Sequence, residues 1–296
     1  MRRRPTLIAL LLLIGALALA ACGSSSKSTK STSTSATAST PAALSLSISE
    51  QGKKASFTAP ASAKGGLVTV TLRNGGKKPH SAQLALLDGN HKPAELLKTL
   101  GATKGPPAWV HLVGGPSGVA PGQTGASTVV LAAGNYVVID FGGPGSGNGP
   151  PALKALKVTS GSGGSLPSTA TTITATAPAK DKYKWQISGA LKTGNAPLTF
   201  VSKGGKDAVH IIAAARVTGH PSDAQIVKAL KSNGKPPPFV DQASFTSTAV
   251  LDGGKSEVTS LALRKPGEYV VFCPLTDRDG GKQHDQEGLV TRVTVK

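Results

Sequence analysis

The sequence predicts a mainly β protein that consists of two tandem Greek-key β-sandwiches, each with a short helical insertion. Short segments in which apolar and polar residues alternate, separated by glycine-bearing turns, are typical of strands and recur along the chain. The two halves of the chain look like copies of one unit, and each copy has one short amphipathic segment of helical pattern. Many short strands in roughly a hundred residues indicate a β-sandwich or a Greek-key barrel.

The first residues predict export and a lipid anchor. Arg2, Arg3 and Arg4 precede an apolar run, 7–21, which is too short for a stable membrane span. The run ends in the sequence Leu-Ala-Ala-Cys22-Gly, which resembles the lipobox of bacterial lipoproteins, where the cysteine is acylated and becomes the new N-terminus. The resemblance implies a signal peptide over 1–21, lipidation of Cys22, and an extracytoplasmic protein anchored to the bacterial cell membrane. The alternative is a plain secretory signal in which Cys22 is incidental.

Composition divides the rest of the chain. Residues 22–42 are rich in Ser and Thr and contain almost nothing that could bury apolar area, so we expect a disordered tether there. A Gly-, Ser- and Thr-rich stretch at 160–178 is expected to be a linker. The two segments that remain, 43–159 and 179–296, each have the size of one domain.

An internal repeat relates these two segments. Matching residues stand 130 residues apart at three places: His80 and His210, Leu100 and Leu230, Val110 and Val240. Three matches at one offset predict that both segments share one fold. The match continues further along with a short insertion in the second copy, so that Asp140 of the first segment corresponds to Cys273 of the second.

The individual elements follow from local patterns. Ser222 is followed three residues later by Gln225, which is the spacing of a helix capping box, and the apolar residues that come next predict a short helix. The alternating segments predict strands, which we expect at 67–72, 128–131, 136–141, 257–263, 269–272 and 290–295.

The C-terminal hairpin places a thiol and an imidazole at the two ends of one loop. Cys273 follows the strand expected at 269–272, and His284 lies in the polar, glycine-bearing loop that leads to the last strand. Cys with His is a ligand set that copper and zinc favour. If Cys22 bears lipid, Cys273 is the only thiol of the mature chain, so no internal disulfide can form. The only methionine, Met1, leaves with the signal peptide, which excludes a methionine ligand.

The order of these residues resembles that of the cupredoxin family, the blue-copper sandwich of plastocyanin and azurin. A His precedes a strand, a late strand ends in Phe-Cys-Pro, and a loop with a His and a Gly-Leu pair leads into the final strand. The resemblance covers 180–296 and, with the metal residues lost, 45–159. It implies these roles: His210 and His284 as imidazole ligands, Cys273 as thiolate ligand, and Leu289 in the axial methionine position. The loop between Cys273 and His284 is longer than in plastocyanin.

A trigonal set of two His and one Cys is the equatorial shell of a blue-copper site. Because leucine gives no donor, the resemblance implies one copper ion at high potential, with Cu(I) favoured. The predicted function is that of a cell-envelope lipoprotein that binds copper for electron transfer or copper handling, with a redox or copper-handling protein as partner. The alternative is a metal-free interaction or scaffolding lipoprotein, in which Cys273 is a buried small hydrophobe, His284 a solvated loop residue and His210 a strand cap.

The first segment is expected to have no metal site. It keeps His80, but Asp140 stands at the cysteine position and no His follows before the final strand. The other histidines, His91, His111 and His220, are expected to be ordinary loop or surface residues, because nothing with ligand spacing accompanies them.

Charge and motifs exclude other classes of protein. The net charge of +18 becomes +15 when the three arginines of the signal are removed, and the basic residues are spread along the chain. Few aromatic residues and no Arg-rich helix argue against nucleic acid as a partner, whereas anionic lipid headgroups or wall polymers suit this charge. No nucleophile elbow, phosphate loop or His-Glu-x-x-His motif is present, so we do not expect an enzyme.

Overall fold

The computed structural model describes residues 40–52, 54–100, 105–141, 151–231 and 236–296, and it confirms the predicted mainly β fold. The predicted signal peptide, Cys22 and nearly all of the predicted tether lie outside the described residues. None of the helices in the described ranges has the length and apolar character needed to cross a membrane.

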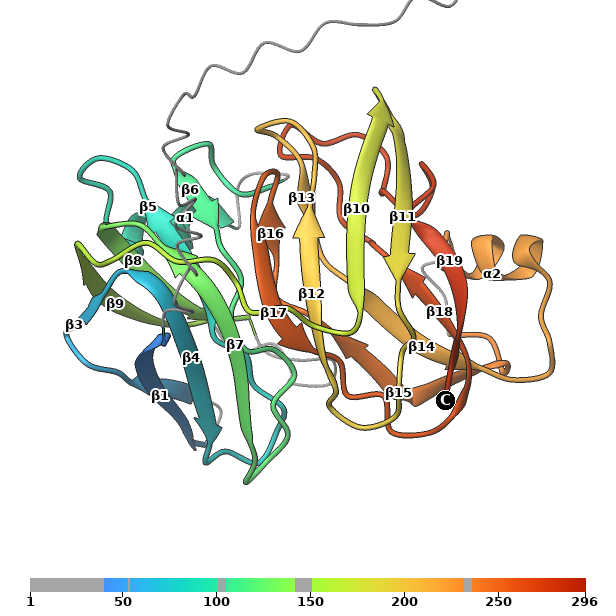
Figure 1. Ribbon diagram of the computed structural model, residues 1–296, viewed down its shortest axis with the longest axis horizontal. Coiled ribbons are helices and arrows are strands. Elements are labelled where there is room, and N and C mark those ends of the chain that lie inside the picture. The colour runs from blue at the N-terminus through green and yellow to red at the C-terminus, as the bar shows by residue number, and fades with distance from the viewer. Residues whose placement is uncertain (1–39, 53, 101–104, 142–150, 232–235) are drawn as a thin grey trace, which may run out of the picture. The chain divides into compact units, whose positions relative to one another are not determined.

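The strands form four sheets (Figure 1). The largest sheet has the strand order β11 (Lys182–Ser188), β10 (Thr172–Ala179), β12 (Pro197–Ser202), β17 (Ser256–Ser260), β7 (Thr124–Leu131), β4 (Gly66–Asn74), β1 (Ala42–Gln51) and β2 (Lys54–Thr58). A five-stranded sheet has the order β3 (Ser62–Lys64), β9 (Ala152–Thr159), β8 (Gly134–Asp140), β5 (Gln83–Leu87) and β6 (Val110–Leu112). A four-stranded sheet has the order β15 (Val240–Ser247), β14 (Ala213–Val217), β18 (Gly267–Phe272) and β19 (Val290–Val295), and a small sheet pairs β13 (Val209–His210) with β16 (Leu251–Asp252).

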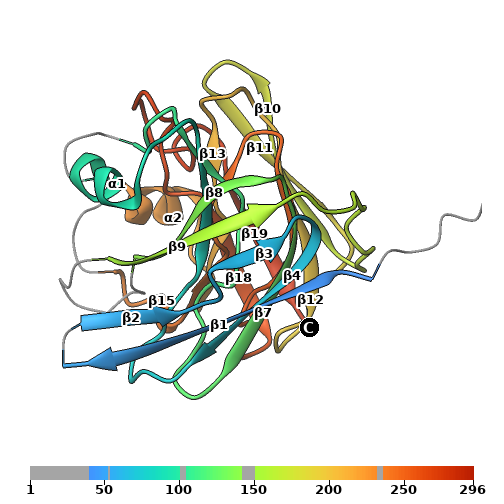
Figure 2. The ribbon, with the colours of Figure 1, turned by 90° about the vertical axis from the view of Figure 1, so that its left-hand side faces the viewer.

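Two sandwiches result from these sheets, and the largest sheet contributes one layer to each of them. Strands β1, β4 and β7 pack against β5, β8 and β9 to form the first sandwich, whose layers Figure 2 shows from the side. Strands β10, β11 and β12 pack against β14, β18 and β19 to form the second sandwich.

Side-chain alternation explains these layers. In β1 the side chains of Leu44, Leu46 and Ile48 are buried in the core of the first sandwich, while the residues between them are exposed or half-buried. Burying each such side chain contributes about 1.5–3 kcal/mol. Strand β18 differs because it is buried on both faces: Tyr269 and Val271 face the core of the second sandwich, and its other face packs with a helix.

The repeat appears in the order of the elements. Helix α1 (Pro93–Leu100) and helix α2 (Asp223–Leu230) begin 130 residues apart, and each follows the strand that the same offset relates, β5 and β14. Strands β1 and β4 are parallel, as are β10 and β12. The capping box predicted at Ser222 is confirmed, since Ser222 Oγ accepts a hydrogen bond from the Gln225 amide and the Ser222 amide donates to Gln225 Oε1.

One predicted boundary differs from the observed elements. Strand β10 occupies Thr172–Ala179, although 160–178 was expected to be a linker. The strand contains many Thr and Ala residues and few large apolar ones, but it pairs with β11 on one side and with β12 on the other. Ladder pairing on both sides therefore makes this segment a strand despite its composition.

The two sandwiches meet along several contacts. Strand β17 of the second pairs with β7 of the first, which places Glu257 opposite Val129. The Gln83 side chain bonds Val250 in both directions, with its Oε1 accepting at 2.7 Å and its Nε2 donating at 3.0 Å. Glu257 is fully buried at this junction, where its Oε2 accepts a hydrogen bond of 2.9 Å from the Gly115 amide. Burial raises the pKa of the Glu257 carboxyl to about 8.

This buried carboxyl predicts a pH-dependent stability. The folded state keeps the Glu257 proton up to a pH of about 8, whereas an ordinary glutamate loses it near 4.5. Stability contributed by the bound proton is therefore complete below pH 4.5 and declines as the pH rises to about 8, by at most about 1.4 kcal/mol per pH unit. We expect Glu257→Gln to flatten this decline in urea unfolding measured from pH 5 to 9. Glu268→Gln, at a partly exposed ion pair with Arg292, is the control and should keep the wild-type slope; equal slopes in all three proteins would contradict the prediction.

Candidate metal centre

The structure brings His210, Cys273 and His284 together from three different places in the second sandwich. His210 ends β13, Cys273 directly follows β18, and His284 lies in the loop between β18 and β19. All three side chains are fully buried. Among the described residues, these three form the one group of His, Cys, Asp or Glu side chains whose ligand atoms converge.

The loop that contains two of these residues is folded back on itself by backbone hydrogen bonds. The Cys273 amide donates to the Leu289 carbonyl, the Asp285 amide to the Cys273 carbonyl, and the Leu289 amide to the His284 carbonyl at 2.7 Å. Gly288 has a φ of 116°, and a Cβ there would collide with the Tyr183 carbonyl oxygen. Glycine is therefore required for the loop to approach β11, which explains the Gly-Leu pair in the sequence.

The donor atoms face one another at short range. Nδ1 of His210 lies 3.1 Å from Nδ1 of His284, and Sγ of Cys273 lies 3.6 Å from the same His284 atom. All three atoms lie within 4.8 Å of one another, which places them within about 2.8 Å of a common point, close to metal–nitrogen and metal–sulfur bond lengths of about 2.0–2.3 Å. The sulfur also accepts a long hydrogen bond, 3.5 Å, from the Ile211 amide.

The outer side of His284 is held by two further residues. Nε2 of His284 lies 3.2 Å from an Asp277 carboxylate oxygen. That carboxylate accepts hydrogen bonds of 2.8 and 3.0 Å from the Tyr183 hydroxyl. The Tyr183 ring packs against both imidazoles, with its centroid 4.3 Å from that of His284 and 5.2 Å from that of His210. A carboxylate behind a ligand histidine fixes the ring and leaves the inward nitrogen as an acceptor.

Burial sets the protonation of the three candidate ligands. It lowers the pKa of His210 to about 3, with the nearby His284 ring acting in the same direction, and it also lowers the pKa of His284 against the opposing effect of Asp277. Both rings are therefore neutral at neutral pH and have lone pairs available. Burial raises the pKa of the Cys273 thiol to about 12, so a metal that binds there must displace a proton.

The donor set fits copper better than zinc. Structural zinc sites use four protein donors in a tetrahedron, whereas this group has two nitrogens and one sulfur. Three such donors are those of a trigonal copper centre with a weak axial position. Leu289, which the sequence analysis placed at the axial position, is fully buried in the same apolar cluster as Cys273.

The equivalent place in the first sandwich contains an ion-pair cluster. Nδ1 of His80 lies 2.6 Å from an Asp140 carboxylate oxygen, and Nε2 lies 2.8 Å from Glu50. The Ser81 amide donates to Asp140, just as the Ile211 amide donates to Cys273 in the second sandwich. Both ring nitrogens of His80 are thus engaged by carboxylates, and Asp140 occupies the place of the thiol.

The remaining histidines lie away from the convergent group. His91 pairs with Glu95 and stacks on Trp109, while His111 lies 2.7 Å from Asp88. His220 has a positive φ of 48° in the turn before α2.

Sequence reasoning identified the three convergent residues but missed those around them. Asp277 lies inside the loop between Cys273 and His284, so its position in the sequence was a usable signal. Tyr183 and Glu50 come from strands distant in sequence, β11 and β1, and no local pattern connects them with a histidine.

Comparisons with known proteins give only distant structural matches. No protein-family model and no curated protein matches the sequence. A multicopper oxidase of known structure is 13% identical with a TM-score of 0.24, over 86% of this chain and 88% of that chain. Auracyanin B is 21% identical with a TM-score of 0.27, over 45% of this chain and 93% of that chain. Auracyanin A, a "blue" copper protein from the green thermophilic photosynthetic bacterium Chloroflexus aurantiacus, is 17% identical with a TM-score of 0.28, over 40% of this chain and 99% of that chain. Since these TM-scores are low, the function proposed below depends on the geometry of this chain.

Proposed function

We propose that this chain is an extracytoplasmic lipoprotein, anchored through Cys22, that binds one copper ion through His210, Cys273 and His284. The observation that supports the proposal most directly is the convergence of two imidazole nitrogens and one sulfur, at 3.1 and 3.6 Å, in a fully buried position. A buried thiol packed only among aliphatic side chains, with His284 turned to water, would have supported the metal-free alternative. Here His284 is buried and its Nδ1 faces the thiol.

Each residue has a defined part in this proposal. The two neutral rings offer their Nδ1 lone pairs, and Cys273 offers its sulfur once the thiol proton has left. Asp277 orients His284, and Leu289 closes the site with an apolar side chain that has no donor atom. Bound copper would supply a one-electron couple between Cu(I) and Cu(II), which suits electron transfer or copper handling.

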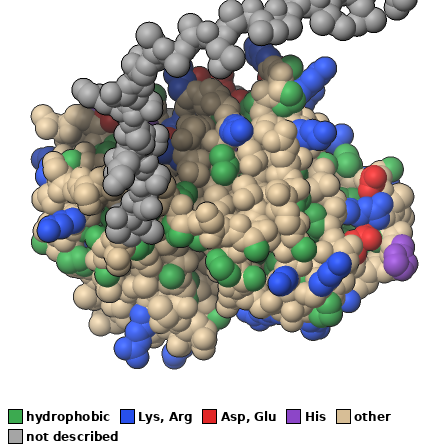
Figure 3. Space-filling model, viewed as in Figure 1, with side chains coloured by type: hydrophobic (Ala, Val, Ile, Leu, Met, Phe, Trp, Pro, Cys, Tyr) green, Lys and Arg blue, Asp and Glu red, His purple; other side chains and the backbone are tan. Residues whose placement is uncertain are grey.

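We propose further that the protein is not an enzyme. All three ligand side chains are fully buried, so a substrate could not reach an ion held there without opening the loop. Its partner would instead be a redox or copper-handling protein at the cell envelope. Lys and Arg side chains are dispersed over the face seen in Figure 3, which suits attraction to anionic envelope polymers rather than binding of nucleic acid.

Copper titration tests this proposal. Residues 38–296, which retain all of β1, are titrated with Cu(II) and followed by visible absorption, with Cys273→Ser as the matched variant. We expect one equivalent to produce an intense thiolate-to-copper charge-transfer band that Cys273→Ser lacks. A colourless protein that binds one equivalent of Cu(I) through Cys273 would be a copper carrier. Binding of neither oxidation state would reject the copper proposal and leave a metal-free interaction module.

A further inference from the structure

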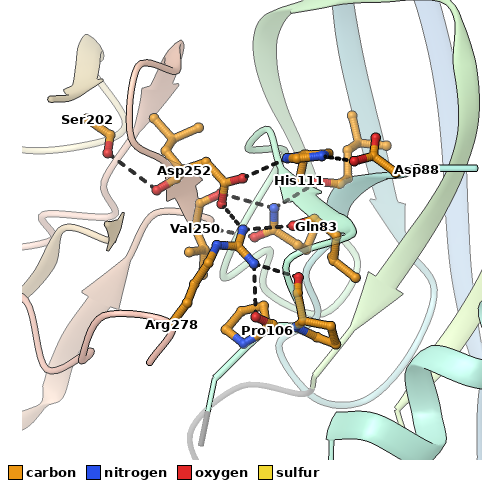
Figure 4. Close-up of polar contacts among 12 residues, drawn as sticks. Gln83, Asp88, Pro106, His111, Ser202, Val250, Asp252 and Arg278 are labelled. Carbon is orange, nitrogen blue, oxygen red and sulfur yellow. Dashed lines mark hydrogen bonds and ion pairs between the residues drawn. The ribbon is translucent and has the colours of Figure 1, made fainter. Parts of the chain in front are cut away.

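Arg278 lies in the loop between Cys273 and His284, and its side chain reaches the first sandwich (Figure 4). Its guanidinium donates four hydrogen bonds. They go to the carbonyl oxygens of Pro106 at 3.0 Å, Pro107 at 2.8 Å and Val110 at 2.7 Å, and to the Asp252 carboxylate at 2.6 Å. The Arg278 side chain is only 7% exposed.

This arrangement is specific to arginine. A buried cation is tolerated only when its charge and its donors are satisfied. Here Asp252 supplies the opposite charge, while three backbone carbonyls of one short segment accept the remaining bonds. A lysine keeps the charge, but it cannot present donors in a planar fork to several acceptors at once. The contact therefore depends on the shape of the guanidinium and not on its charge alone.

One side of the candidate metal centre is connected to this contact through a tight turn. Asp277, which holds Nε2 of His284, directly precedes Arg278, and the Gly280 amide closes the turn by donating to the Asp277 carbonyl at 2.9 Å. The Arg278 amide donates to the Asp207 carbonyl at 3.0 Å. The turn is thus fixed by the second sandwich at its backbone and by the first sandwich at its side chain.

The other side of the centre is connected through β16. Asp252 lies in β16, which pairs with β13 so that Leu251 is opposite His210. The neighbouring Val250 bonds the side chain of Gln83 in the first sandwich, and its carbonyl accepts from the Gly114 amide at 3.2 Å. Both elements that contribute a histidine therefore rest on the first sandwich.

We infer that Arg278 is a positioning residue of the candidate metal centre, through which the first sandwich holds the Cys273–His284 loop in place. This inference rests on the proposed function for its copper readouts, but not for its metal-free one. It also gives the first sandwich a role in the protein although its own histidine is engaged by carboxylates: it is the support on which the metal centre of the second sandwich is assembled.

The test compares Arg278→Ala and Arg278→Lys with Arg292→Ala in the chain over 38–296. Arg292 is the matched control, because it also bonds a backbone carbonyl, that of Pro221, and carboxylates, but stays within the second sandwich. Hydrogen exchange of the metal-free proteins is measured first. Peptides over 273–289 are expected to exchange about tenfold faster in both Arg278 variants, whereas those of β12 keep the wild-type rate.

Copper-loaded samples give the second readout. We expect both Arg278 variants to lose about tenfold in copper affinity and to shift the charge-transfer band and the reduction potential, while Arg292→Ala changes neither. If wild-type protein binds no copper, the proposed function fails, and the exchange data alone decide whether Arg278 holds the loop. Wild-type exchange over 273–289 in folded Arg278→Ala would overturn the inference. A wild-type spectrum in Arg278→Lys would overturn its dependence on the fork.

Discussion

Replacing His210 with alanine is expected to lower the affinity for copper by more than about 100-fold, because loss of a residue that merely supports a ligand already costs 10–100-fold. His210 is one of three donors, and among the described residues no other His, Cys, Asp or Glu joins the convergent group to replace it. Competition with a chelator of known Cu(I) affinity measures the effect. The charge-transfer band formed with Cu(II) should be lost in the same variant.

The chain provides a control at the equivalent position of its own first copy. His80→Ala removes the corresponding imidazole 130 residues earlier, where both ring nitrogens face carboxylates. Copper affinity should stay at the wild-type value in this variant. Tight copper binding by His210→Ala would place the ion elsewhere, and a loss of affinity in His80→Ala alone would place it in the first sandwich.

His80→Ala has its own large effect, which is on stability. The imidazole and the Asp140 carboxylate are only 4% and 3% exposed and are 2.6 Å apart. Removing one partner of a buried ion pair costs about 3 kcal/mol, since the other group stays desolvated. We expect the midpoint of thermal unfolding to fall by roughly 6–12 °C, as measured by circular dichroism on the metal-free protein.

His91→Ala is the matched control for this second prediction. It removes a histidine with the same kind of carboxylate partner at 2.7 Å, but that pair is 41% and 48% exposed. Exposed pairs contribute little because water screens them, so the midpoint should hardly change. Equal shifts in the two variants would show that burial of the His80 cluster does not matter for stability.

Much of the fold follows from local pattern. The alternation at 67–72 lies within β4, and the capping box at Ser222 begins α2. Both depend on neighbours along the chain, which a sequence displays directly. Strand β10 was not expected, because Thr and Ala residues resemble a linker until two partner strands pair with them. Pairing partners are a tertiary property, and composition does not contain them.

The site divides in the same way. The order His210, Cys273, His284 follows from the sequence because two of these residues share one hairpin loop and the third is identified by the repeat. The supporting residues do not follow. Tyr183 reaches the imidazoles from β11, and Arg278 reaches carbonyl groups about 170 residues earlier in the chain. Such contacts depend on how two sandwiches are placed, which no local periodicity encodes.

The pairing of β17 with β7 has a consequence for how the two copies depend on each other. In one sandwich alone, either strand would be the last of its sheet, with unpaired amides and carbonyls that can recruit a strand from another molecule. Each copy thus shields the adhesive edge of the other. Gene duplication therefore did more here than supply a spare domain: it replaced an edge that invites aggregation with an internal seam, and neither half can be removed without exposing it again.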